Sequence, residues 1–369
     1  MSAPAPIPFI DLRPGDDEAA VREAIDRVLA RGWFVLGPEV EAFESEFAAA
    51  SGAAYAVGVG TGTDAIALAL RALDIGGSDE VIVPAMTAAY TALAVIAAGA
   101  TPVIVDVEPD TLTIDPAACA AAVTSRTRAI VPVHLYGQPA DMQAIRDVAA
   151  RHSLAIVEDC CQAHLATEHG VAVGTRSEAA AFSFYPTKNL GALGDGGAVV
   201  TGSEALAARI RRLRNGGQQH RAQHVEAGVN SRLDDLQAAV LRARLPLLPQ
   251  WTMRRRALAA RYRQLLPSSL RTIAERDPGH VYHLFPVLSH ERGSLQAHLS
   301  AAGVDTMVHY PMALTTQPAF AALASHECPV AVAAANELLS LPLSPRLTDA
   351  DVVRVADEVA AFAKGHRLA

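Results

Sequence analysis

Short apolar runs alternate with helix-periodic segments over the middle of the chain. The apolar runs lie at residues 54–60, 80–84, 101–107, 128–137, 154–160, 180–186 and 197–202. Between them, apolar residues recur at helical spacing over 63–73, 91–99, 116–122 and 141–152. Continuous apolar strands separated by helices form sheets that are buried on both faces. The pattern therefore predicts an α/β fold with a mostly parallel central sheet flanked by helices.

The segments on either side of this region have different patterns. Residues 1–16 are rich in proline and predict an extended arm, and helix-period positions follow at 18–30 and 38–50. A long helical pattern begins near Ser231 and is interrupted by Pro246 and Pro249.

The last part of the chain mixes both kinds of pattern. Strand-like segments lie at 281–288 and 304–311, and helical ones at 294–302, 330–339 and 348–363. A chain of 369 residues also exceeds the size at which a single core usually stops growing. We predict an N-terminal arm (1–16), a large domain (17–247) and a smaller C-terminal α+β domain (248–369).

Composition and charge exclude several classes of protein. Apolar residues make up 51% and charged residues 19%, which is typical of a globular chain. The formal charge of -8 argues against nucleic-acid binding, which needs a basic face. No stretch has the length of an apolar membrane span, and the N-terminus lacks the pattern of a signal peptide. Four irregularly spaced cysteines do not suggest a disulfide framework, so we expect a cytoplasmic protein.

Lys188 is the first candidate for chemistry. It lies in SFYPTKNLGALGDGG, directly after an apolar run, and the only other lysine is Lys364 near the C-terminus. A desolvated lysine amine has a lowered pKa and is a good nucleophile. The alternative is a lysine in a solvated loop.

Asp159 ends the apolar run LAIVED, and open α/β sheets bind ligands at the carboxyl ends of their strands. A carboxylate there can hold a proton on a ring nitrogen, and Gln162 lies three residues later. The alternative, which is about equally frequent, is that an Asp at a strand end caps the following helix.

A third feature is the turn Thr61-Gly62-Thr63 before a helix, which presents N–H groups and hydroxyls suited to a phosphate. Ser183, on the run leading to Lys188, offers another hydroxyl. Such a turn also caps many helices without any ligand. An amine, an acid for a pyridine nitrogen and donors for a phosphate are together what pyridoxal phosphate (PLP) chemistry requires.

The histidines do not predict a metal site. The pairs His280 with His283 and His220 with His224 lack an organised third ligand. His134 and His309 are better candidates for a polar substrate pocket, with a satisfied core histidine as the alternative reading.

Read together, these motifs resemble those of the DegT/DnrJ/EryC1/StrS sugar aminotransferases, a family of fold type I PLP enzymes. The resemblance covers nearly the whole chain. It rests on GWFVLGPEVEAFE, GVGTGTDAIALAL, VPVHLYGQPADM, VEDCCQAH, SFYPTKNLGALGDGGAVV, GVNSRLDDLQAAVLRARL, VHYP and LLSLPLSP.

The resemblance implies roles for individual residues. Lys188 would bind the cofactor covalently and move protons, Asp159 would face the pyridinium nitrogen, and Gln162 would lie beside the cofactor hydroxyl. Phosphate contacts would come from Gly62, Thr63 and Ser183, and from Asn230 of a neighbouring subunit, so that a homodimer shares its active sites. Substrate contacts are assigned to His134, Tyr136, Arg232, His309, Tyr310 and Tyr90.

The chain departs from the family pattern in two places. The family usually stacks an aromatic residue on the cofactor directly after the position of Thr87, but here Ala88 follows and Tyr90 comes two residues later. The family also commonly has a histidine after its HYP segment, whereas this chain has Thr315 at about that place.

The resemblance implies transfer of an amino group from glutamate or glutamine, through PLP and its pyridoxamine form (PMP), to a nucleotide-linked keto-deoxysugar. HLYGQPADM resembles members that act on dTDP-linked 3-keto sugars, which favours C-3. The alternatives are a C-4 keto sugar, a cyclitol, or a regulatory protein that binds PLP or sugar without turnover.

Overall fold

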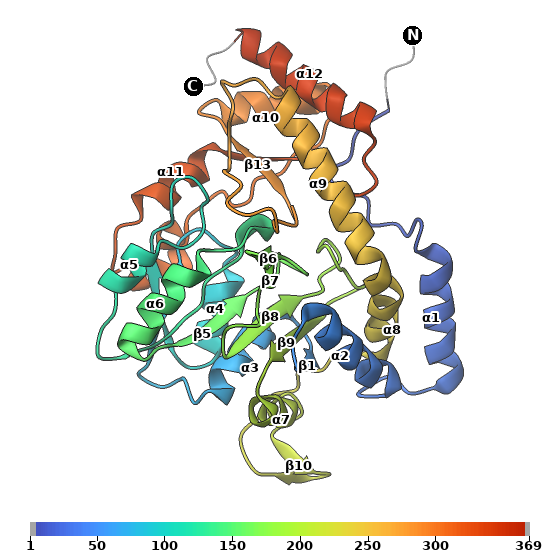
Figure 1. The fold of residues 1–369 in the computed structure, drawn as a ribbon, viewed down its shortest axis with the longest axis vertical. Coiled ribbons are helices and arrows are strands. Elements are labelled where there is room, and N and C mark those ends of the chain that lie inside the picture. The colour runs from blue at the N-terminus through green and yellow to red at the C-terminus, as the bar shows by residue number, and fades with distance from the viewer. Residues whose placement is uncertain (1–4, 366–369) are drawn as a thin grey trace.

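The computed structural model describes residues 5–365. A seven-stranded sheet in the order β1-β9-β8-β5-β4-β2-β3 forms its centre (Figure 1). The strands are β1 (Tyr55–Val59), β2 (Glu80–Pro84), β3 (Thr101–Val105), β4 (Thr127–Ile130), β5 (Ala155–Asp159), β8 (Ala179–Ser183) and β9 (Gly197–Thr201). Pairing is parallel from β3 through β8, and only β9 pairs antiparallel with its two neighbours. The predicted mostly parallel sheet is confirmed.

Both faces of the sheet are buried under helices. Successive strand residues alternate between separate apolar clusters: Val81 and Val83 pack into one and Ile82 into another. The helices of the large-domain region are α1 (Glu18–Arg31), α2 (Pro38–Ser51), α3 (Gly62–Ala72), α4 (Tyr90–Ala97), α5 (Pro116–Ala121), α6 (Met142–His152), α7 (Glu204–Leu213) and α8 (Asp235–Arg244). Burial on both faces explains why these strands read as continuous apolar runs.

The C-terminal region contains a second, smaller sheet in the order β12-β13-β14. Its strands are β12 (Arg271–Thr272), β13 (Phe285–Leu288) and β14 (Leu338–Leu341). Its helices are α9 (Leu248–Leu265), α10 (Arg292–Ala301), α11 (Pro329–Glu337) and α12 (Asp349–Gly365). The mixture of strands and helices agrees with the expected α+β region, while the boundary at residues 247 and 248 stays a prediction.

The arm and the hairpins complete the chain. Ile7 pairs with Val304 and packs into the same apolar cluster as α9 and α12, so the arm is attached to the C-terminal region. Two short hairpins, β6 (Thr167–Glu168) with β7 (Val171–Ala172) and β10 (Gln218–His220) with β11 (Gln223–His224), lie outside the main sheets. Within residues 5–365 no helix combines the length and apolar character needed to cross a bilayer.

Three segments differ from the predicted pattern. The strand-like segment 281–288 forms a strand only from Phe285, because Val281 and His283 instead donate their N–H groups to the carbonyls of Gly137 and Tyr136. The segment 304–311 makes only isolated bridges at Val304 and Met307. The helix expected at 330–339 ends at Glu337, where β14 follows and pairs with β13.

Candidate active site

The predicted reactive residues converge at one edge of the central sheet. Asp159 ends β5 and Ser183 ends β8, two parallel neighbours whose carboxyl ends lie side by side. Lys188 follows β8 in a short loop, and its backbone N–H bonds the carbonyl of Tyr185 at 2.8 Å. The N-terminus of α3 reaches the same edge, because Gly62 lies against Ser183 and Cys161. This is where open α/β sheets bind ligands.

Two donors hold the Asp159 carboxylate in place. The backbone N–H of Cys161 donates to Oδ1 at 3.1 Å, and the Thr91 hydroxyl donates to Oδ2 at 2.8 Å. Thr91 lies 3.0 Å from the Thr87 hydroxyl, so a short chain of hydroxyls ends on the carboxylate. The Asp159 residue is 5% exposed, and these two hydrogen bonds fix the orientation of its carboxylate.

Thr91 is the functional residue that the sequence did not predict. We expect Thr91→Val to lower kcat by about 10- to 100-fold, because losing a hydrogen bond to a charged group costs roughly 1.5–3 kcal/mol. Thr91→Ser keeps the hydroxyl and should retain most of the activity. Steady-state kcat of the two variants checks this role, and a valine variant as active as the parent would contradict it.

Burial lowers the pKa of the Lys188 amine, while the nearby Asp159 carboxylate and Cys161 act in the opposite direction. A buried amine with a lowered pKa is more often neutral and therefore nucleophilic at neutral pH. The next residue, Asn189, is anchored from the C-terminal region: its amide donates to the Val281 carbonyl at 3.0 Å and its Oδ1 lies 3.2 Å from His283 Nδ1. The loop that carries Lys188 is thus fixed from two sides.

The first turn of α3 forms a cradle suited to a phosphate. Thr61 caps this helix by accepting the Asp64 N–H at 3.0 Å, which leaves Gly62 and Thr63 in the first turn. A Cβ at Gly62 would lie 2.7 Å from Cys161 Sγ and 2.8 Å from Ser183 Cβ, so only glycine fits this approach. The helix end carries a partial positive charge and N–H groups that favour an anion.

Gln162 is oriented by two hydrogen bonds. Its Oε1 accepts the Tyr136 N–H at 2.6 Å, and its Nε2 donates to the Tyr310 hydroxyl at 2.9 Å. An amide nitrogen carries two hydrogens, so one remains to donate to a ligand oxygen. Gln162 therefore has one N–H free to donate a hydrogen bond to the phenolic oxygen of the cofactor.

Tyr136 positions two neighbouring residues of the site. It is 1% exposed, its hydroxyl donates to the His309 carbonyl at 2.6 Å, and its own N–H donates to Gln162 Oε1 at 2.6 Å. Tyr136 thus holds Gln162 and His309 in place, and its assignment as a substrate contact stays a prediction.

His134 also belongs to the core. It is fully buried, its Nδ1 accepts the Ala140 N–H at 3.0 Å, and its Nε2 donates to Glu158 at 2.8 Å. Protein groups occupy both ring nitrogens, as the core alternative expects, and the substrate contact assigned to His134 stays a prediction. The same bonds leave no imidazole nitrogen for a metal, although His134, Glu158 and Cys160 place ligand-type atoms within 4.8 Å of one another.

His309 and Tyr310 lie close to the reactive centre. Burial and the nearby Lys188 charge lower the pKa of His309 to about 4, so its ring is neutral at pH 7. The His309 ring stacks on Phe9 of the arm and its Nδ1 lies 3.0 Å from the Ser340 hydroxyl. The Tyr310 hydroxyl accepts a hydrogen bond from the Gln162 amide at 2.9 Å.

The remaining predicted site residues, Asn230, Arg232 and Tyr90, are at least partly exposed to solvent. Asn230 is exposed, and Arg232 donates to Asn215 Oδ1 at 3.3 Å. Tyr90 opens α4 and is 64% exposed, one residue from Thr91. Their contacts with substrate, cofactor or a second subunit stay predictions.

The described residues fit PLP. They provide a buried amine, a carboxylate held for a ring nitrogen, an amide donor and a helix-end cradle for phosphate, all at one sheet edge. The cradle in particular has glycine in the first turn of α3, which lets Ser183 pack directly against the helix end whose N–H groups favour an anion.

Comparison with known proteins agrees with this geometry. The sequence profile of the DegT/DnrJ/EryC1/StrS aminotransferase family matches residues 16–360. A Streptomyces venezuelae protein, dTDP-3-amino-3,4,6-trideoxy-alpha-D-glucose transaminase, is 50% identical over 365 residues, which are 97% of this chain and 96% of the relative.

Solved structures give the same result. The fold matches that of S. venezuelae DesV with a TM-score of 0.95 and 49% identity, covering 98% of this chain and 99% of DesV. It also matches NtdA from Bacillus subtilis, solved with bound PMP, with a TM-score of 0.92 and 32% identity, covering 98% of this chain and 86% of NtdA. The chain is a PLP-dependent aminotransferase with the fold type I architecture, and it belongs to the DegT/DnrJ/EryC1/StrS aminotransferase family.

Proposed function

We propose that this enzyme transfers an amino group from glutamate or glutamine to C-3 of a dTDP-linked keto-deoxysugar. The observation that carries the proposal is Lys188 beside Asp159 at the sheet edge, in a chain 50% identical to a relative named for a dTDP-3-amino sugar. The family places the amine and the acid in this arrangement for amino transfer, and the relative's name supports the dTDP group and the C-3 position.

Each residue of the site has its own role in the proposed amino transfer. When bound, PLP supplies an electron sink for the carbon that gains or loses a proton. Lys188 moves that proton, Asp159 holds a proton on the ring nitrogen, and Gln162 donates to the ring hydroxyl. Gly62, Thr63 and Ser183 bind the phosphate and so fix the distance between the ring and the amine.

We assign the acceptor pocket to the groups around His309, Tyr310, Arg232 and Tyr90. A neutral His309 and the Tyr310 hydroxyl suit sugar hydroxyls, which need hydrogen-bond donors and acceptors without charge. Arg232 supplies a positive charge for an anionic part of the donor or the substrate. Tyr90 is the nearest aromatic side chain in sequence to the position where the family stacks a ring on the cofactor.

Substrate choice tests the C-3 assignment. We expect kcat/KM to be at least about 10²-fold higher with a dTDP-linked 3-keto sugar than with its 4-keto isomer, because a misplaced carbonyl leaves polar pocket groups unpaired. Mass spectrometry of parallel reactions with each substrate measures the products. Equal turnover of both, or turnover of the 4-keto sugar alone, would contradict the assignment, and turnover of neither would point to a cyclitol acceptor.

We also propose a cytoplasmic homodimer in which each active site uses Asn230 of the partner subunit. Large apolar side chains are exposed at Trp33 (57%), Phe34 (46%) and Tyr90 (64%), as expected of a surface that a second copy covers. Four free thiols suit a reducing compartment.

Complementation tests the shared site. Lys188→Ala and Asn230→Asp chains are each expected to be nearly inactive as homodimers. Co-refolded in equal amounts, they should regain about a quarter of the wild-type sites, because half of the random dimers are mixed and each mixed dimer has one intact site. Recovery that stays at background, with mixed dimers verified by mass, would show that Asn230 acts within its own chain.

A further inference from the structure

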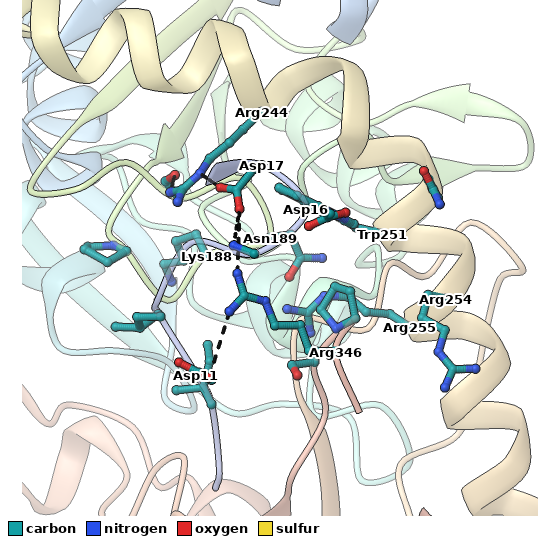
Figure 2. Close-up of a pocket in the computed structure, with 18 residues that line it drawn as sticks. Asp11, Asp16, Asp17, Lys188, Asn189, Arg244, Trp251, Arg254, Arg255 and Arg346 are labelled. Atoms are coloured by element: carbon teal, nitrogen blue, oxygen red, sulfur yellow. Dashed lines mark hydrogen bonds and ion pairs between the residues drawn. The ribbon is translucent and has the colours of Figure 1, made fainter. Parts of the chain in front are cut away.

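A second polar cavity lies beside the loop that carries Lys188 (Figure 2). It measures about 540 Å³ and lies between the N-terminal arm, the Lys188 loop, the first turns of α9 and the segment 344–346. Lys188 itself lines this cavity, so the cavity borders the reactive amine, whereas neither Gly62 nor Ser183 lines it, so it is separate from the cradle assigned to the cofactor phosphate. Its volume is in the range of small-molecule sites.

The acidic side chains of this cavity already have partners. Asp17 binds Arg244 Nε at 2.7 Å and the Gly15 N–H at 2.8 Å. Asp16 accepts the indole N–H of Trp251 at 3.1 Å. Asp11, the third, accepts three bonds from the Arg13 side chain, at 3.0, 3.3 and 2.7 Å. Each of the three carboxylates therefore already has a donor, and the cavity lining contains further arginines that these carboxylates do not neutralise.

Arg255 contributes a positive charge to this cavity that no carboxylate pairs with. Its guanidinium is buried, with the residue 4% exposed, and only Nη1 donates, to the carbonyls of Tyr282, His283 and Leu343. Its Nε is buried without a hydrogen-bond partner among the described residues, and no carboxylate in residues 5–365 forms an ion pair with it. Burial lowers its pKa to about 10, so the group remains charged at neutral pH.

Arg346 faces the same cavity and is only loosely paired. Its nitrogens lie 3.6 Å from Asp17 and 3.9 Å from Asp11, the two contacts drawn as dashed lines in Figure 2. Both distances exceed a hydrogen bond. The Arg346 guanidinium thus lines the cavity without a hydrogen bond to either carboxylate. Arg255, which has no ion-pair partner among the described residues, lines the same cavity.

We propose that this cavity binds a phosphate group between Arg255 and Arg346. Planar guanidinium forks match phosphate oxygens: free phosphate or a terminal phosphate offers three unprotonated oxygens, and a sugar-linked diphosphate offers two non-bridging oxygens and one negative charge on each phosphorus, so either can engage two such forks. The phosphate has two sources of the same chemistry: the diphosphate of a nucleotide-linked substrate, or inorganic phosphate. Only the first source rests on the proposed function.

Calorimetric titration of the cofactor-loaded enzyme tests the site. The probes are inorganic phosphate and dTDP, and the variants are Arg346→Gln and Arg254→Gln. Arg346 is chosen because it is exposed, so that its replacement should leave the fold intact, whereas loss of Arg255 would also release three carbonyls. Arg254 is the matched control, because it lines the cavity but already donates to Asp349 at 2.8 Å and to the Leu347 carbonyl at 2.6 Å.

We expect one saturable site per chain, weakened at least about tenfold by Arg346→Gln and less than about threefold by Arg254→Gln. If dTDP binds more tightly than phosphate and competes with the sugar substrate, the site holds the substrate diphosphate. If phosphate binds equally well and does not inhibit turnover, the site holds free phosphate. Binding of neither probe, or binding that Arg346→Gln leaves unchanged, would overturn the proposal even if amino transfer itself is confirmed.

Discussion

Replacing Lys188 with alanine is expected to reduce kcat by about 10⁴-fold or more. General acid–base catalysis by one positioned group contributes roughly 10²–10⁴-fold, and this lysine also provides the covalent attachment of the cofactor. The loop that carries it is anchored through Asn189 and through the Tyr185 carbonyl, so the variant should fold normally. Single-turnover measurements of amino transfer from glutamate give the rate directly.

The chain offers a matched control for this experiment. Lys364, the other lysine, is exposed near the end of α12, and its replacement by alanine should leave kcat unchanged. Circular dichroism and a thermal unfolding curve establish that both variants are folded. A Lys188→Ala enzyme within tenfold of the wild-type rate would show that another group moves the proton.

Replacing Asp159 with asparagine is expected to reduce kcat by about 10²–10³-fold, the range observed when one preorganised electrostatic partner is removed from an active site. An asparagine side chain keeps the size of Asp159 and its amide oxygen can accept the Cys161 N–H, but its amide nitrogen is a donor toward the Thr91 hydroxyl, and the neutral amide cannot hold a proton on a ring nitrogen with a full negative charge. The loss should appear in kcat, with cofactor binding changed much less, because the phosphate cradle is untouched.

Asp195→Asn serves as the control for charge. Asp195 lies in the glycine-rich loop after Lys188 and is exposed, so its neutralisation should have little effect. Fluorescence titration with PLP separates binding from turnover in both variants. If Asp159→Asn and Asp195→Asn have the same kcat, the carboxylate does not act on the ring.

The central sheet could be predicted because its strands are buried on both faces. Runs such as VIVP and LAIV are continuously apolar, and Asp159, which closely follows the second run, lies where the sheet edge must be. Asp159 and Lys188 were identifiable for this reason, since each follows a strand whose position the pattern specifies.

Tertiary contacts decided the features that the sequence left open. His134 ends an apolar run as Asp159 does, yet the Ala140 N–H and Glu158 occupy its ring, and no local pattern indicates those partners. Tyr136 adopts a left-handed backbone with φ of 59°, which turns its N–H toward Gln162. Thr91 contacts Asp159 across 68 residues of chain, so periodicity within α4 could not reveal it.

The segment after residue 280 shows the same limit. VYHLFPVL contains β-branched residues, but its first part does not pair as a strand. The Val281 carbonyl accepts the Asn189 amide, and the N–H groups of Val281 and His283 donate to the carbonyls of Gly137 and Tyr136. Strand propensity describes a fit to a half-buried pleated surface, and a segment that crosses between two loops does not meet one.

Borohydride reduction of the PLP-loaded enzyme, followed by peptide mass spectrometry, is the most direct test of the amine at the sheet edge. We expect a single reduced adduct on the peptide that contains Lys188, with none on Lys364. An adduct on Lys364, or a fully loaded enzyme that yields no adduct, would contradict this expectation.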